Sequence, residues 1–200
     1  MIAVTEGRFR EAVMLLPRRD VLGLIGVAFC AGAGPALAQA GAAPTGLTFA
    51  RPGTTPLRLS DYRGRPVLVV NTATRCGFAG QMASLEQLWQ RYRERGLMLL
   101  AVPSNDFGGQ ETLEGAAIAQ AARETHGATY AFAEKTKVTG ADAHPFYRWA
   151  AAQRPAETPR WNFHKYLVGR DGQLVGGYSS GTDPIGPQLV QAIGRELQAG

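Results

Sequence analysis

Residues 67–102 read VLVVNTATRCGFAGQMASLEQLWQRYRERGLMLLAV, and this stretch decides the fold. It begins and ends with continuous apolar runs, at 67–70 and 97–102, of the kind that form strands buried on both faces of a parallel sheet. Between the two runs, apolar side chains recur three and four residues apart, as on one face of a helix: Met82, Leu85, Leu88, Trp89 and Tyr92. Two strands joined by one helix form a βαβ unit, which predicts an α/β fold.

The ends of this helix carry recognisable signals. Ser84 followed by Gln87 fits a capping box for this helix, and a start before Ser84 stays open. Gly96 predicts the helix end, because glycine readily adopts the left-handed conformation that closes helices. Cys76 therefore falls in the loop between the first strand and the helix. Catalytic and ligand-binding groups gather at this carboxyl edge of parallel strands.

The chain outside this unit continues the alternation of strands and helices. We predict a short strand at 57–59, a helix at 113–124 that ends near Gly127, a short helix from Asp142 through Trp149, strands at 163–168 and 173–178 joined by a turn at 169–172, and a final helix with Asp183 as N-cap and Pro184 as its first residue. A βαβ unit followed by an antiparallel hairpin and a last helix indicates a thioredoxin-like fold, with a central mixed sheet flanked by helices.

The first forty residues have the features of an export signal. The pair Arg18-Arg19 precedes an uncharged stretch at 21–38, rich in Ala and Gly, which ends in the small-residue pattern Ala36-Leu-Ala38. Paired arginines favour the twin-arginine route of bacteria, so we expect cleavage near residue 40 and a periplasmic protein. The alternative is a membrane anchor that is not cleaved. Met14 is an alternative start of translation.

Removal of residues 1–40 leaves residues 41–200 as one domain, long enough to form its own core. The full chain has a net charge of +5, of which the first forty residues carry +1, so the domain keeps a modest +4 without a basic stripe. This charge pattern excludes the nucleic-acid-binding class. Cys30 lies in the signal, so Cys76 becomes the only thiol of the domain. We expect no stable membrane association after cleavage.

Cys76 lies between Arg75 and Gly77, and three interpretations of it are open: an inert core residue, a metal ligand, or a nucleophile. The thiolate is the reactive form, and the charge of Arg75, unpaired N–H groups at the helix start and close backbone approach at Gly77 all favour it. A metal site is disfavoured, because the other ligand candidates are scattered along the chain: His126, His144 and His164. The packing and nucleophile interpretations remain balanced.

Four blocks of the sequence carry a resemblance to a known family. They read VNTATRCGFAGQ at 70–81, LLAVPSNDFGGQE at 99–111, HPFYRW at 144–149 and WNFHKYLVGRDGQLV at 161–175. In order and spacing they resemble the glutathione peroxidase family in its cysteine-containing form, and they span nearly all of the region 57–197. A lone Cys-Gly-Phe would be weak evidence, whereas four blocks in order are specific.

The resemblance implies that Cys76 is the peroxidatic thiol of a peroxidase, with Trp161 and Asn162 on the far side of the pocket. A thiolate would attack one peroxide oxygen while the other leaves as hydroxide or alkoxide. The indole N–H of Trp161 and the amide of Asn162 can stabilise the thiolate and the developing charge. We therefore expect an antioxidant enzyme of the oxidative-stress response, without a metal or cofactor, that reduces hydrogen peroxide and organic or lipid hydroperoxides.

Asp106 stands where the family usually has glutamine, and it follows Asn105, to which we assign a supporting role together with Arg75 and Gly77. Glutamine donates N–H bonds, whereas an ionised aspartate only accepts them, and its negative charge beside Cys76 would disfavour the thiolate. Three alternatives are open: Asp106 is protonated and donates, it turns away while Asn105 or backbone takes its place, or the activity is weak. Our hypothesis counts Asp106 among the catalytic residues that line the site.

The chain lacks the second cysteine that many relatives dependent on thioredoxin carry in the helix matching 113–124. Ser104 occupies a further position where relatives often have cysteine. A sulfenic acid on Cys76 therefore cannot be resolved within the domain. We expect an external reductant, either glutathione or a cysteine of a partner protein.

Two other functions are open on the sequence. An exported thioredoxin-fold binding module with lost or weak turnover is the alternative that Asp106 suggests, and a thiol-disulfide oxidoreductase is disfavoured by the missing second cysteine. The short segment 150–160 leaves little room for a long insertion at an oligomer interface, so we expect a monomer with an open site. We also expect His164 to point outward and Gly108-Gly109 to pack closely behind the site.

Overall fold

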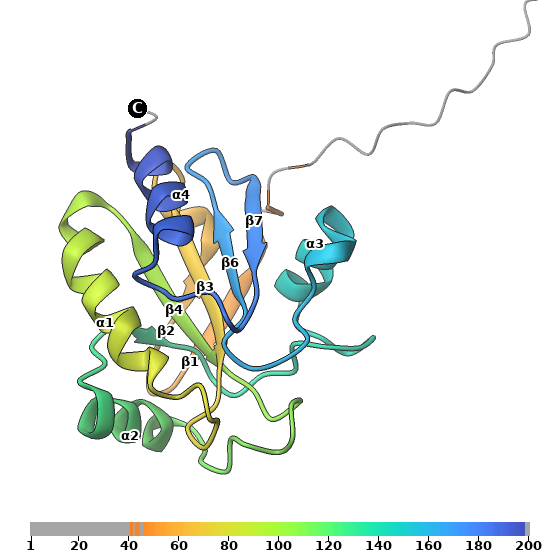
Figure 1. The fold of residues 1–200 in the computed structure, drawn as a ribbon. Coiled ribbons are helices and arrows are strands. Elements are labelled where there is room, and N and C mark those ends of the chain that lie inside the picture. Colours follow the sequence, from red (N-terminus) through yellow and green to blue (C-terminus); the bar gives the residue numbers. More distant parts are fainter. Residues whose placement is uncertain (1–40, 42, 45, 199–200) are drawn as a thin grey trace, which may run out of the picture. The chain divides into compact units, whose positions relative to one another are not determined.

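The computed structural model describes residues 41, 43–44 and 46–198, and the predicted export signal at 1–40 lies outside the described residues. A five-stranded mixed sheet forms the centre of this part of the chain (Figure 1). Its strands follow the order β5 (Ala131–Phe132), β4 (Met98–Pro103), β3 (Val67–Thr72), β6 (Lys165–Val168) and β7 (Leu174–Tyr178). Strands β3, β4 and β5 are parallel, whereas β6 pairs antiparallel with β3 and with β7. The predicted thioredoxin-like α/β fold is confirmed.

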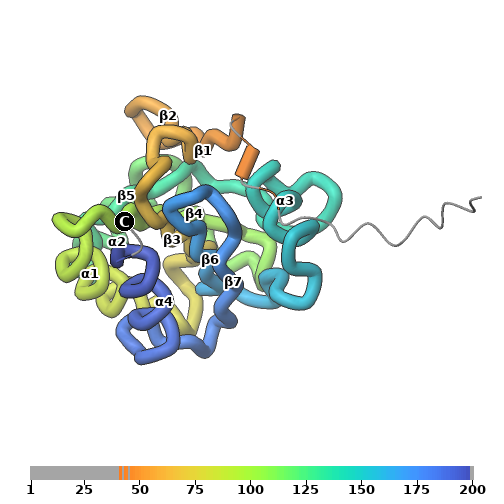
Figure 2. The backbone as a smooth tube through the Cα atoms, turned by 90° about the horizontal axis from the view of Figure 1, so that it is seen from above, coloured from red at the N-terminus to blue at the C-terminus, as the bar shows by residue number. Residues whose placement is uncertain are grey.

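Helices cover both faces of the sheet (Figures 1 and 2). The four α-helices are α1 (Gln81–Tyr92), α2 (Ala116–His126), α3 (Pro145–Gln153) and α4 (Pro187–Gln198). Alternate side chains of β3 serve the two faces: Leu68 and Val70 join the core formed with α1, α2 and α4, whereas Val67 and Val69 join the core formed with α3. Successive side chains of a strand point to opposite faces, so a continuous apolar run is what a strand covered on both faces requires.

A small hairpin completes the α3 face. Where the sequence predicts one short strand at 57–59, the structure has β1 (Thr48–Arg51) paired antiparallel with β2 (Thr54–Arg58), followed by a 3-10 turn at Leu59–Tyr62. Buried side chains of the hairpin pack against α3 and the sheet. Further 3-10 turns lie at Arg93–Arg95 and Pro155–Glu157. Within the described residues, none of the helices has the length and apolar character needed to span a membrane.

The βαβ unit forms as predicted, but α1 starts earlier than the capping-box signal indicates. It begins at Gln81, with Gly80 as an N-cap that makes no side-chain bond. A succession of tight turns leads into it, because Ala79 donates to the Cys76 carbonyl (2.8 Å) and Met82 donates to the Ala79 carbonyl (2.9 Å). The helix therefore begins three residues before Ser84, the earlier start that the sequence left open. The predicted end is confirmed, because the 3-10 turn that follows α1 closes at Gly96 with a left-handed φ of 105°.

The other helix starts also differ from the sequence predictions. His144, not Asp142, is the N-cap of α3, because its Nδ1 accepts a bond from the Phe146 amide (3.2 Å). Asp183 forms a separate turn before α4, in which its Oδ1 accepts from the Ile185 amide (3.1 Å), and the helix itself begins only at Pro187. Local signals identify a turn but do not decide whether a helix continues directly from it. Helix α2 starts at Ala116, later than predicted, and closes at Gly127 as expected.

Candidate active site

The loops that follow β3 and β4 leave the sheet at the same edge, at the bottom of Figure 1. Cys76 lies in the first of them as a free thiol that is 5% exposed. Its Sγ accepts a hydrogen bond from the Phe78 amide (3.4 Å), two residues further along the chain. A backbone N–H directed at sulfur favours the thiolate over the neutral thiol. The predicted placement of Cys76 at the carboxyl edge of the parallel strands is confirmed.

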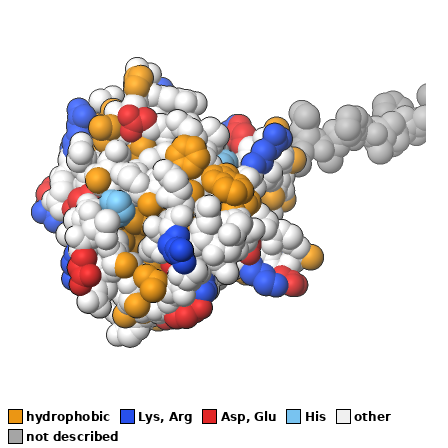
Figure 3. Space-filling model, turned by 60° about the horizontal axis from the view of Figure 1, so that its bottom comes forward, with side chains coloured by type: hydrophobic (Ala, Val, Ile, Leu, Met, Phe, Trp, Pro, Cys, Tyr) orange, Lys and Arg blue, Asp and Glu red, His pale blue; other side chains and the backbone are white. Residues whose placement is uncertain are grey.

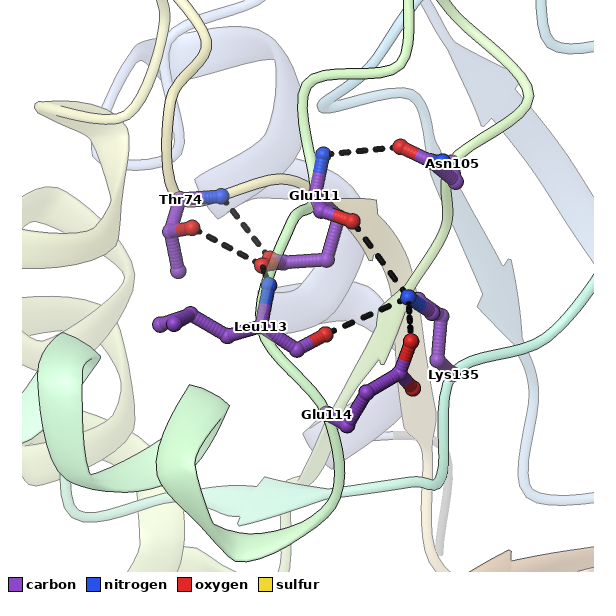
Figure 4. Close-up of polar contacts among 6 residues, drawn as sticks. All are labelled: Thr74, Asn105, Glu111, Leu113, Glu114 and Lys135. Atoms are coloured by element: carbon purple, nitrogen blue, oxygen red, sulfur yellow. Dashed lines mark hydrogen bonds and ion pairs between the residues drawn. The ribbon is translucent and has the colours of Figure 1, made fainter.

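A buried carboxylate from the second loop holds the segment before Cys76. The fully buried Glu111 accepts bonds from the Thr74 amide and hydroxyl (both 2.9 Å) and from the Leu113 amide (3.2 Å), as Figure 4 shows. The Asn105 side chain accepts from the Glu111 amide (3.0 Å), so it supports the loop rather than the thiol directly. The sequence analysis did not identify Glu111, because an acidic residue in a loop gives no sign that it will be buried.

Gln110 connects the loop that carries Cys76 (residues 73–80, the thiol loop) to the segment that carries Trp161 and Asn162. Its carbonyl accepts from the Arg75 amide (3.1 Å), and its side-chain Oε1 accepts from Asn162 Nδ2 (3.0 Å). Asn162 Nδ2 also lies 3.4 Å from the Phe107 carbonyl. One residue thus contacts both the neighbour of Cys76 and a predicted site residue that lies far away in the sequence. Gln110 lies within the second block of the resemblance, at 99–111, and nothing in the sequence alone indicated a role for it.

The segment at Trp161 and Asn162 is tied to the end of β3. Asn71 Nδ2 donates to the Trp161 carbonyl (3.1 Å), and the Phe163 amide donates to the Asn71 carbonyl (2.6 Å). Phe163 has a φ of 63°, the one positive φ of a non-glycine residue in the described part of the chain. Strained backbone of this kind persists where its surroundings hold it, which is common at functional sites. The strain fixes the directions of Asn162, which is fully buried, and Trp161, which is 40% exposed.

The Trp161 ring lies over the second loop. Its centroid is 6.0 Å from that of Phe107, and a Cβ on Gly108 would lie 3.6 Å from Cη2 of Trp161. Gly108 and Gly109 both have positive φ, at 66° and 62°, so the backbone conformation favours glycine there. The nearest contacts of an added Cβ, at 3.6 Å and 3.9 Å, are ordinary ones, so the predicted close packing is not what requires glycine.

Asp106 does not face the residues that Gln110 connects. Its Oδ2 accepts three hydrogen bonds, from the amides of Val138 (2.6 Å) and Thr139 (2.9 Å) and from the Thr139 hydroxyl (3.1 Å). A carboxylate oxygen with these three donors is held in the loop after β5. The geometry fits the second of the three alternatives, in which Asp106 turns away, and it goes against the hypothesis that this carboxylate lines the site.

The side chains beside Cys76 contribute less than expected. Arg75 is exposed, and its contact in the site is the backbone bond to Gln110. A Cβ on Gly77 would meet nothing within 4 Å, so no close approach within the chain requires glycine there. The sulfur accepts one backbone amide, from Phe78, and the 104–115 loop holds the backbone of Thr74 and Arg75 just before Cys76.

His164 is buried, contrary to the prediction that it points outward. It is 5% exposed and lies edge-on to Tyr166, with ring centroids 4.6 Å apart. Burial, aided by the charge of Lys165, lowers its pKa to about 4, so the imidazole is neutral near pH 7. The other two histidines lie at helix ends, with His126 as the last residue of α2 and His144 as the N-cap of α3.

On the face that carries these loops, hydrophobic side chains (orange in Figure 3) lie among uncharged polar ones, and most charged side chains lie towards the edge of the view. Phe78, within the loop that carries Cys76, and Trp161, next to Asn162, are 39% and 40% exposed. Among the described residues, His, Cys, Asp and Glu do not come together in any group of three or more that would hold a metal ion.

Comparisons with known proteins agree with this geometry. Residues 48–151 match the family model described as glutathione peroxidase. A "glutathione peroxidase-like peroxiredoxin GPX5" from Chlamydomonas reinhardtii is 38% identical over 143 residues, which cover 69% of this chain and 88% of the relative. A "hydroperoxy fatty acid reductase gpx1" from a Synechocystis strain is 37% identical over 138 residues, which cover 64% of this chain and 82% of the relative.

Solved structures give the same result for the fold. The crystal structure of Trgpx in its apo form has 33% identity and a TM-score of 0.57, covering 74% of this chain and 92% of that one. A thiol:disulfide interchange protein from Chlorobium tepidum shares the fold at 15% identity, with a TM-score of 0.57 and coverage of 80% and 98%.

Proposed function

The chain belongs to the glutathione peroxidase family and is a thiol-dependent peroxidase, and from this premise we propose that Cys76 is the thiol that reacts with peroxide. The observation that carries the assignment is the position of Gln110, which bonds the Arg75 backbone on one side and Asn162 on the other. Enzymes of this family use glutathione or thioredoxin-type thiols as reductants and need no prosthetic group.

The proposed reaction begins with the Cys76 thiolate. Its sulfur donates an electron pair to one peroxide oxygen, so an S–O bond forms as the O–O bond breaks. The second oxygen takes up a proton and leaves as water or an alcohol, and Cys76 becomes a sulfenic acid. Donors held close to the sulfur stabilise the thiolate and the leaving oxygen.

We assign these donors to Trp161 and Gln110, with Asn162 in a supporting role. Trp161 offers its indole N–H, and its partial exposure leaves it accessible to an incoming peroxide. Asn162 gives its amide nitrogen to Phe107 and Gln110, so its part is to hold Gln110. The Gln110 oxygen faces Asn162, and its own N–H groups are the donors that remain for the sulfur. In this proposal Gln110 does what the family glutamine at the position of Asp106 would do.

Asp106 acts in this proposal as an anchor for the 138–139 segment and takes no part in the chemistry. Its three hydrogen bonds keep one carboxylate oxygen occupied away from Gln110 and Asn162. The alternative function, an exported binding module with lost turnover, was based on a negative charge of Asp106 beside the thiol. With Asp106 bonded to the 138–139 segment, this reason for the alternative no longer applies.

The reductant in this proposal comes from outside the domain. A first thiol condenses with the sulfenic acid, releasing water and forming a mixed disulfide, and a second thiol attacks that disulfide and regenerates Cys76. Both electrons therefore come from the external thiol, either glutathione or a partner cysteine. Cys76 is the free cysteine of the described residues, and the helix α2 contains none.

We extend the proposal to bulky hydroperoxides. Phe78 and Trp161 are exposed large apolar side chains, and a monomer would leave them open to a substrate. Such surfaces suit the acyl chain of a lipid hydroperoxide. The Synechocystis relative is named for hydroperoxy fatty acids, which supports the same substrate class here.

The site of action belongs to the same proposal. Residues 1–40 have the features of a twin-arginine signal, so we propose a periplasmic enzyme, with an uncleaved membrane anchor as the alternative. Mass spectrometry of the protein from a periplasmic fraction tests this, because cleavage near residue 40 would give a thiol count of one, and a full-length product in the membrane fraction would contradict it.

The decisive experiment combines a sulfenic-acid probe with stoichiometric hydrogen peroxide. We expect rapid labelling at Cys76, none in Cys76→Ser, and labelling slowed by about tenfold in Gln110→Ala because one donor is lost. Asp106→Ala is the matched control from the same loop and should label at the rate of the unchanged protein. Labelling no faster than that of free cysteine would contradict the peroxidase assignment and favour a binding module.

A further inference from the structure

Lys165 is a buried base that the proposed reaction does not use. It opens β6, is fully buried, and donates from Nζ to Gln81 Oε1 (2.5 Å), to the Thr182 carbonyl (2.6 Å) and to the Ser180 carbonyl (3.5 Å). All three acceptors are neutral oxygens. They belong to the first residue of α1 and to the segment between β7 and α4, so Lys165 joins three parts of the fold.

This arrangement differs from that of the other two lysines. Lys135, which is half-buried, pairs with Glu114, and Lys137 pairs with Asp142 at the surface. Lys165 instead keeps its ammonium group in the interior with neutral partners, which costs free energy. Burial lowers its pKa to about 8, and the charge of Asp183 offsets part of that change. Groups with such perturbed properties are frequent at functional sites.

A continuous set of contacts leads from Lys165 to the sulfur of Cys76. Gln81 accepts from Lys165 and also donates through Nε2 to the Ser180 carbonyl (2.7 Å), so its side chain is fixed at both ends. The Gln81 backbone amide donates to the Phe78 carbonyl (2.9 Å), and the Phe78 amide donates to Cys76 Sγ (3.4 Å). Hydrogen bonds thus link Lys165 to Gln81, Gln81 to Phe78, and Phe78 to the sulfur.

We propose that Lys165 is a positioning residue for the reacting thiol: by fixing Gln81, it orients the turn whose Phe78 amide faces Cys76 Sγ. The proposal rests on the proposed role of Cys76. Without the ammonium group, the Gln81 side chain loses one of its two fixed contacts and the first turn of α1 gains freedom. The Phe78 N–H then spends less time directed at sulfur, and the thiolate loses part of its stabilisation.

The test measures the titration of Cys76 without using peroxide. The full chain carries Cys30→Ser so that Cys76 is its only thiol, and the rate of alkylation by iodoacetamide is followed from pH 5 to pH 10. We expect Lys165→Met and Gln81→Leu each to move the titration midpoint upward and to slow alkylation at pH 7 by about threefold to tenfold, the worth of one hydrogen bond. The double variant should be no slower than the slower single variant, because both changes break the same set of contacts.

Lys137→Met is the matched control, since Lys137 contacts only Asp142 at the surface, and it should leave the curve unchanged. Thermal unfolding of each variant shows that the fold is intact. If Lys165→Met does not fold, Gln81→Leu decides alone. An unchanged midpoint in a folded Lys165→Met or Gln81→Leu variant overturns the proposal, and so does a double variant that loses the sum of both effects. If the protein without these substitutions fails to reduce peroxide, the proposed function is overturned. A shifted midpoint in the variants would then still show that Lys165 positions the Cys76 thiol.

Discussion

Glu111 and Lys165 are the two fully buried charged residues that border the thiol loop, and they hold it from opposite ends. Glu111 comes from the loop after β4 and binds Thr74, just before Cys76. Lys165 comes from β6 and binds Gln81, where α1 begins. The acid accepts from two amides and a hydroxyl, whereas the base donates to two carbonyls and an amide oxygen.

The difference shows what selects the sign of a buried charge here. Neither side chain is bonded to an opposite charge; Lys135 bonds the backbone carbonyl of Glu111 instead of its carboxylate. The backbone before Cys76 presents N–H donors that need an acceptor, and the region around Gln81 presents oxygens that need a donor. Buried backbone groups must find partners, so the polarity of the backbone decides which residue fits.

The largest effect expected from breaking this pair is on the acid. Glu111→Ala leaves the Thr74 amide, the Thr74 hydroxyl and the Leu113 amide without their acceptor, so the free energy of unfolding should fall by about 3 kcal/mol or more. Urea unfolding measures it. Glu114→Ala, at an exposed position in the same loop, should change stability by less than about 0.5 kcal/mol. A Glu111→Ala loss as small as that of the control would show that Glu111 is not an anchor.

On the side of Lys165, the next largest effect is a loss of stability at acid pH, caused by the adjacent residue His164. His164 has a pKa of about 4 in the folded protein, below its ordinary value of 6.5, mainly because of burial. The unfolded chain binds a proton below about pH 6.5 while the folded protein does not, so stability is lost as the pH falls from 6.5 towards 4. Between pH 7 and pH 5 this amounts to about 2 kcal/mol.

Urea unfolding at both pH values, with His164→Gln for comparison, isolates the contribution of His164. The variant should lose less stability between pH 7 and pH 5 than the unchanged protein. Its remaining loss includes His144, whose pKa is also lowered by burial. Equal losses in the two proteins would mean that His164 is protonated in the folded state at pH 5.

A smaller effect is expected at another acid, Asp106, which anchors the 138–139 segment and makes no bond to the thiol. Asp106→Ala removes the acceptor of the Val138 and Thr139 amides, at a cost of about 1 kcal/mol because these groups are only partly shielded from water. The alkylation curve of Cys76 should not move. A shifted curve would return Asp106 to the site and contradict the assignment of its role to Gln110.

The smallest change in stability is expected for the base itself. Lys165→Met loses three hydrogen bonds but also relieves the cost of a buried ammonium group, so the free energy of unfolding should change by less than about 1 kcal/mol. A loss as large as that of Glu111→Ala would make the two anchors equivalent and give Lys165 a structural role. Differential scanning calorimetry of both variants at pH 7 makes this comparison directly.

Much of the fold could be predicted from the sequence because its signals are local. Apolar runs and helical spacing gave the strands of the βαβ unit, the face of α1 and the hairpin of β6 and β7. The starts of the helices were less predictable. Gly80 makes no side-chain cap at α1, and Asp183 forms a turn that is not followed at once by its helix. A start signal is a short pattern that several turns share, whereas a buried face repeats over many residues.

The sequence by itself determined the class of the protein, because four ordered blocks indicated the family, and it pointed to Cys76, the thiol of the βα loop, as the candidate for the residue that reacts. Only the tertiary structure decided which polar groups surround that loop. It turned Asp106 towards Val138, brought Gln110 to Asn162, and buried Glu111 and Lys165 on either side of the thiol. The physical reason is that a strand or helix is specified by its own periodic contacts, whereas a buried polar side chain is satisfied by backbone groups that folding brings from distant parts of the chain.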